Sequence, residues 1–144
     1  MTCSLLELYD IAERSNIDVD CFSLHKRESL AIQGEDGNCH IAIDPFQLSS
    51  EADERVKLGH ELGHCKQGAF YNRWAVCDVR KKRENTADKW SIHRLVPVDD
   101  LDDAVANGYT EIWSLAEYFN VTEDFMRKAL CWYVHGNLAT NLYF

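Results

Sequence analysis

Alternating apolar and polar positions divide the first third of the chain into a helix and an extended segment. Leu5, Leu8, Tyr9 and Ala12 recur at i, i+3, i+4 and i+7, which predicts an amphipathic helix. The stretches ESLAIQ and CHIAID instead alternate at every second residue, with the turn sequence GEDGN between them. We therefore expect residues 28–44 to form a β-hairpin.

Helical patterns follow the hairpin. Ser50 with Asp53 three residues later resembles a capping box, and predicts a helix that continues to about Gln67 and stops at Gly68. Further helices are predicted at about 84–95, 111–119 and 123–134, and the acidic run Asp99–Asp103 as a loop or helix start. Together these elements predict a single α+β domain over residues 1–144, with a small antiparallel sheet packed on helices.

Composition and charge restrict the partners. The 144 residues are 46% hydrophobic, enough for one core, and a net charge of −9 opposes wide contact with nucleic-acid phosphates. A basic surface would have to be local, and we interpret the run Arg80–Arg83 as solvent-exposed rather than as a docking patch. The sequence lacks a long apolar stretch and a basic leader, so we expect no membrane span and a cytoplasmic location.

The cysteines are scattered and form no C-x-x-C pair, which argues against a zinc knuckle or a thioredoxin-like motif. We expect most of them to be buried thiols in a reducing compartment. Cys65 directly follows His64, but neighbours on a helix point about 100° apart, so it is not expected to bind a metal with His64.

The segment VKLGHELGHCKQG contains a possible metal-binding motif. His60 and His64 are four residues apart on the predicted helix, so both imidazoles project from one face and can bind one ion. Hydrolytic zinc sites usually have three protein ligands and an open position for water. Glu61 is then the candidate general base, and Glu84 on the next helix the candidate third ligand.

Spacing on the second helix supports this set. Glu84 and Asp88 are four residues apart, so Asp88 can accept the free ring N–H of a ligand histidine while Glu84 binds Zn²⁺. Gly59 and Gly63 share a face of the first helix and each costs about 1 kcal/mol of helix stability relative to alanine. We expect this face to accept the second helix closely at Ala87.

These motifs resemble a known family. LGHELGH followed by ENTADKWSIHRLVP is similar to the ImmA/IrrE family of zinc metallopeptidases, whose second motif places Glu84, Ala87 and Asp88 in the same order. His93 and Arg94 depart from its pattern. The resemblance implies a catalytic core in residues 1–97, C-terminal helices with a helix-turn-helix-like pair in 98–144, and cleavage of a helix-turn-helix repressor of a phage or mobile element.

Several points stay open from the sequence. The donor that stabilises the oxyanion is one of four candidates, namely Tyr71, His93, Tyr109 and His135. The strand Cys39–Asp44 is expected to leave one flank unpaired for a substrate peptide.

Two alternative functions remain. The pair LAEYFNVTEDFMRKAL has the spacing of a helix-turn-helix, with Asn120 able to adopt the left-handed conformation, but acidic Glu123 and Asp124 begin its second helix and weigh against DNA reading. The second alternative is a zinc-containing regulator without catalysis, against which the intact Glu61 argues.

Overall fold

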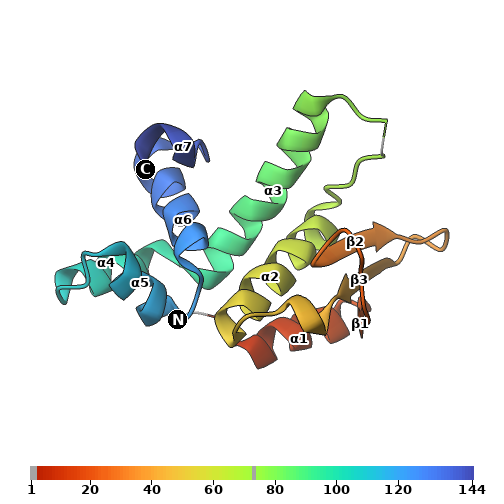
Figure 1. Ribbon diagram of the computed structural model, residues 1–144, viewed down its shortest axis with the longest axis horizontal. Coiled ribbons are helices and arrows are strands. Elements are labelled where there is room, and N and C mark those ends of the chain that lie inside the picture. Colours follow the sequence, from red (N-terminus) through yellow and green to blue (C-terminus); the bar gives the residue numbers. More distant parts are fainter. Residues whose placement is uncertain (1–2, 73) are drawn as a thin grey trace.

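The computed structural model describes residues 3–72 and 74–144 and confirms the α+β class. Two helices, α2 (Glu51–Gln67) and α3 (Cys77–Leu95), lie side by side in the centre. The sheet and α1 (Leu5–Arg14) lie on one side of this pair, and the C-terminal helices lie on the other (Figure 1). Every helix in the described residues is too short or too polar to span a bilayer.

The sheet has three strands in the order β1-β3-β2. Strands β2 (Ser29–Gln33) and β3 (Cys39–Ile43) form the predicted antiparallel hairpin. The sequence did not reveal β1 (Asp18–Cys21), which pairs in parallel with β3. The sheet is therefore mixed rather than wholly antiparallel.

The position of β1 contradicts the prediction that the strand Cys39–Asp44 has a free flank. β1 covers one side of β3 and β2 covers the other, so β3 is central. β3 directly precedes α2 in the chain, which favours it for this role in the sequence, but adjacency in sequence does not determine order in a sheet. In the described residues, β2 has a strand partner on one side alone, and its other flank is an edge.

Helix α2 begins and ends where the sequence predicts. The Ser50 side chain accepts a hydrogen bond from the Asp53 amide at 3.1 Å, and Gly68 ends the helix in the left-handed conformation at a φ of 59°. Both ends therefore follow from local hydrogen bonding and glycine geometry.

Helix α3 is longer than predicted, because it begins at Cys77 rather than near Glu84. Its first two turns have no apolar repeat, and its N-cap residue Val76 makes no side-chain cap. The two usual signals of a helix start are thus missing. The basic run Arg80–Arg83 consequently lies within the helix, on an end that extends away from the rest of the protein (Figure 1).

The C-terminal part consists of four helices joined by short turns, and the last helix was not predicted. Its helices are α4 (Val98–Ala106), α5 (Ile112–Phe119), α6 (Glu123–His135) and α7 (Thr140–Tyr143). Asn120 joins α5 to α6 in the left-handed conformation, as predicted.

A short 3₁₀ turn, η1 (Pro45–Gln47), precedes α2.

A buried arginine ties this helix pair to α2. Arg55 is 3% exposed and donates to the backbone carbonyls of Phe119, at 2.6 Å, and of Asn120. A further bond reaches the carbonyl of Cys3 near the N-terminus. The cation thus caps the C-terminal end of α5, where carbonyl groups lack helical partners.

Helices α2 and α3 touch at a glycine. A Cβ atom added at Gly63 would lie 2.5 Å from the Ala87 carbonyl oxygen, which is backbone and cannot rotate away. At Gly59 the nearest atom would be Leu95 Cδ1 at 3.2 Å, which belongs to a side chain. The predicted close approach is confirmed, and Gly63 is the residue that permits it.

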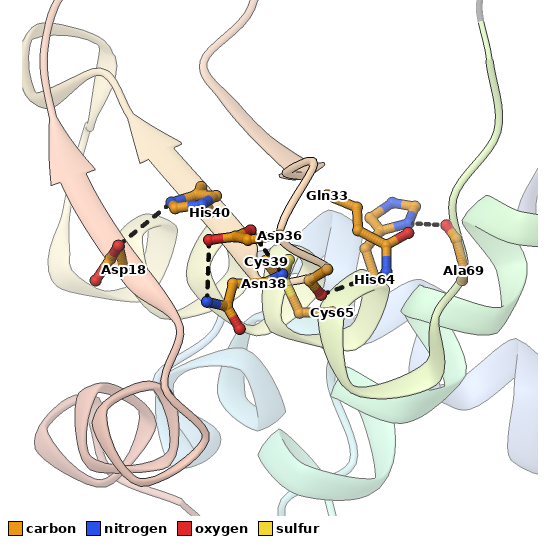
Figure 2. The surroundings of a disulfide bond; sticks show 10 residues. Asp18, Gln33, Asp36, Asn38, Cys39, His40, His64, Cys65 and Ala69 are labelled. Carbon is orange, nitrogen blue, oxygen red and sulfur yellow. Dashed lines mark hydrogen bonds and ion pairs between the residues drawn. A yellow bond between two sulfur atoms is a disulfide. The ribbon is translucent and has the colours of Figure 1, made fainter.

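Two cysteines are bonded, which the sequence did not predict. Cys39 on β3 and Cys65 on α2 form a disulfide with a Cα–Cα distance of 5.7 Å, and Cys65 directly follows His64 (Figure 2). Cys3 and Cys131 are buried free thiols, whereas Cys21 and Cys77 are exposed. The expectation of mostly buried thiols is therefore wrong, because folding brings together two cysteines that are 26 positions apart.

We predict that Gly63→Ala destabilises the protein while Gly59→Ala does not. Both changes add about 1 kcal/mol of helix propensity. At position 63 the methyl group forces α3 away from α2, a form of overpacking that costs about 1–3 kcal/mol. Thermal unfolding of the two variants measures the difference, and equal melting temperatures would refute the close contact at Gly63.

We also predict that reduction of the disulfide lowers the free energy of unfolding by about 3 kcal/mol, because the bond closes a long loop in the unfolded chain. Denaturant unfolding with and without dithiothreitol measures this effect. Cys65→Ser is the control, since its stability should not respond to the reductant. A parent protein that is equally insensitive would contradict the prediction.

Candidate metal centre

Three side chains from α2 and α3 converge on one point. His60 Nε2 lies 3.2 Å from His64 Nε2 and 3.3 Å from Glu84 Oε2, and His64 Nε2 forms an ion pair with the same carboxylate oxygen. One ligand atom of each residue lies within 4.8 Å of the others. The structure thus brings together the three residues that the sequence predicts as metal ligands.

The outer nitrogens of both imidazoles are already engaged. His60 Nδ1 lies 2.8 Å from Asp88 Oδ1, and His64 Nδ1 lies 2.6 Å from the Ala69 carbonyl oxygen. Because both of these partners accept hydrogen bonds, we assign the ring proton of each histidine to Nδ1. The lone pairs of the two Nε2 atoms then point at each other and at Glu84.

Converging lone pairs repel each other unless a proton or a metal ion lies between them. Glu84 Oε2 is buried and has no hydrogen-bond partner in the described residues, although both imidazoles are close to it. An orphaned buried carboxylate oxygen facing two imidazole nitrogens is the arrangement that a divalent ion satisfies. The donor set His₂Glu fits Zn²⁺, and other divalent ions of similar preference also accept nitrogen and oxygen ligands.

The pKa values show how strongly this cluster attracts positive charge. Burial lowers the pKa of His60, but the neighbouring carboxylates of Asp88 and Glu84 outweigh it and raise the pKa to about 10. Burial opposes the charged form of Glu84 as well, yet the two imidazoles lower its pKa well below the usual range. A proton therefore occupies the cluster at neutral pH, and a metal ion has to displace it.

Asp88 connects the cluster to the C-terminal helices. It is 8% exposed, and its second oxygen, Oδ2, accepts a hydrogen bond from Lys128 Nζ on α6 at 3.3 Å. Burial raises the pKa of Asp88, but His60 and Lys128 lower it further than burial raises it. The sequence predicts the role of Asp88 beside a ligand histidine, whereas no sequence signal points to Lys128.

Glu61 lies in the same cleft and is 6% exposed. Ser29 Oγ, at the start of β2, donates a hydrogen bond to Glu61 Oε2 at 2.7 Å. This bond leaves the other carboxylate oxygen available for a proton. A serine at the start of a strand has no distinctive sequence pattern, so Ser29 could not be found before the fold was known.

The cleft has a volume of about 510 Å³, and residues 27–32 along β2 form one wall. Tyr71 lines it as well, with its hydroxyl group 3.4 Å from Glu84 Oε1. The other three candidate donors contact aromatic rings elsewhere: His93 packs on Trp132 and Tyr133, Tyr109 on Tyr118, and His135 on Tyr143. Among the four, the structure places Tyr71 at the cluster.

Comparison with protein-family models, curated proteins and solved structures finds no match for this chain.

We predict that the purified protein binds about one Zn²⁺ per chain through nitrogen and oxygen ligands. Affinity should weaken as the pH falls, because protons and the metal compete for the same imidazole nitrogens. Elemental analysis and X-ray absorption measure stoichiometry and ligand type. A sulfur shell at about 2.3 Å would contradict the ligand set.

Proposed function

We propose that the protein is a zinc-dependent endopeptidase of narrow specificity. The observation that supports this most is the convergence of His60, His64 and Glu84 in a cleft that also holds the Glu61 carboxylate. A structural zinc site would need a fourth protein ligand in place of an open position. None of the other described residues joins the three in a potential metal-binding group.

The edge of the sheet supports a peptide as the substrate. The outer flank of β2 borders the cleft, and an extended peptide can add to such an edge through backbone hydrogen bonds. This replaces the predicted role of β3. Ser29 contributes to both features, because it belongs to the edge strand and also holds Glu61.

The residues divide the chemistry among them. His60, His64 and Glu84 would hold Zn²⁺, which when bound supplies Lewis-acid polarisation of a carbonyl group and of water. Glu61 accepts a proton from the attacking water and later passes it to the leaving amine. The Tyr71 hydroxyl can donate a hydrogen bond to the carbonyl oxygen as negative charge develops on it.

The substrate that we propose is a helix-turn-helix repressor of a phage or mobile element. This part rests on the resemblance of the LGHELGH and ENTADKW segments to the ImmA/IrrE family. We infer cytoplasmic action for the same reason. The Cys39–Cys65 disulfide is less typical of a reducing compartment, so the oxidation state of these two cysteines inside cells tests the proposed cytoplasmic location.

The geometry gives less support to direct DNA reading by α6. Its first turn holds Glu123 and Asp124, and its two cations are already paired, Arg127 with Asp124 at 2.8 Å and Lys128 with Asp88 at 3.3 Å. A recognition helix needs available donors at its N-terminal end. A non-catalytic zinc regulator is the second alternative, and variants of Glu61 discriminate it from a peptidase.

We predict that Glu61→Gln keeps about one zinc per chain and the parent thermal stability, while cleavage falls by about 10² to 10⁴. Glu84→Ala should instead lose zinc, so that its thermal stability no longer responds to the metal. Asp88→Ala should reduce metal affinity or activity by about 10- to 100-fold. Cleavage is measured by mass spectrometry on two substrates: a proteome-derived peptide library, and a repressor encoded beside the gene.

The comparison of parent and Glu61→Gln decides between the functions. Cleavage by the parent that disappears in Glu61→Gln supports the peptidase. If Glu61→Gln cleaves as well as the parent, Glu61 is not the base. If neither cleaves the repressor yet both bind it, the protein is a binding regulator.

A further inference from the structure

The charges of α3 are divided between two faces. The helix contains six Lys and Arg residues and three acids, so its net charge is +3, while the whole chain has −9 and the remainder therefore −12. Glu84 and Asp88 both point inward to the histidines of α2. Asp88 is buried and Glu84 is half-buried at the cleft, so the remaining described acid of α3 is Asp78 in its first turn.

We define the α3 ridge as the six basic and aromatic residues on the side of α3 away from α2: Lys82, Arg83, Lys89, Trp90, His93 and Arg94. Helical spacing puts them on one surface, because they form two adjacent rows, 82–89–93 and 83–90–94, whose members follow each other by seven and then four positions. From Lys82 to Arg94 the ridge is about 18 Å long at 1.5 Å per residue. In the described part of the chain, none of its four Lys and Arg residues forms a salt bridge.

Aromatic rings support the cations at one end. Lys89 Nζ lies 4.7 Å from the centre of the Trp132 ring, and Arg94 Cζ lies 5.2 Å from that of Trp90. A surface pocket of about 340 Å³ opens between these groups, lined by Gln67, Thr86, Lys89, Trp90, His93 and Arg94. Cations over rings next to an apolar hollow suit a partner with carboxylates and one apolar side chain.

We propose that the α3 ridge docks an acidic segment of a partner protein. Charge complementarity identifies the occupant, and the short length of the ridge favours protein over nucleic acid. The acidic helix α4 follows directly after α3, with Asp99, Asp102 and Asp103 on it. A nucleic acid carries a charge at every phosphate and would be repelled beyond the ridge, whereas a short acidic segment ends within it. This docking depends on neither the metal nor hydrolysis.

The experiment uses the full chain and two fluorescein-labelled probes, an oligoglutamate peptide and an oligothymidine of equal charge, measured by fluorescence anisotropy at low salt. We expect the peptide to bind in a salt-dependent manner. The double variant Lys89→Glu with Arg94→Glu should weaken binding by about tenfold or more, since it replaces attractive pairs with repulsive ones.

A matched control changes the net charge equally at a distance from the ridge. Arg14→Glu with Lys26→Glu alters two exposed cations and should leave peptide binding unchanged. Lys82→Gln with Arg94→Gln provides a milder test if the reversal variant unfolds, and thermal melting checks both. The proposal is wrong if the peptide does not bind, if the control weakens binding as much as the ridge variant does, or if oligothymidine binds the ridge more tightly than the peptide. Because fluorescence anisotropy measures binding and not hydrolysis, these results stand apart from the peptidase assay.

Discussion

The contact between Gly63 and the Ala87 backbone is the constraint on which the site depends. A glutamate side chain is short, so Glu84 reaches two imidazoles on another helix because the two backbones touch one turn away. Any side chain at position 63 would separate the helices. The helix propensity lost at Gly63 is thus the cost of bringing Glu84 within range of both imidazoles. The same approach places Asp88 against the outer nitrogen of His60.

This close packing also sorts the charges of α3. The helix contributes Glu84 and Asp88 to the buried cluster, where two imidazoles and Lys128 compensate them. Its cations are left on the opposite side and on the end that extends from the protein. A single helix therefore has an anionic face toward the histidines of α2 and a cationic face toward solvent. In a chain with a net charge of −9, that separation makes the basic surface local.

Much of this arrangement could be predicted from the sequence, because local rules govern it. The hairpin follows from alternation around a turn, α2 from Ser50 and Gly68, and the proximity of His60 and His64 from their spacing of four residues. The start of α3 could not be predicted, since Val76 is not a capping residue and the basic run has no apolar period. Strand β1 and the disulfide depend on contacts between distant segments, which a linear pattern does not encode.

The error over β3 shows how non-local pairing changes a functional argument. With β1 on its flank, β3 becomes a buried central strand, and the edge that borders the cleft passes to β2. That exchange has a chemical consequence, because β2 begins with Ser29, the residue that holds Glu61. A peptide added to the edge of β2 would lie on the same strand that orients the proposed base. In the proposed peptidase, binding of substrate and alignment of the carboxylate would then be coupled through one short strand. Asp88 likewise links the C-terminal helices to His60, because it contacts both Lys128 and the His60 ring.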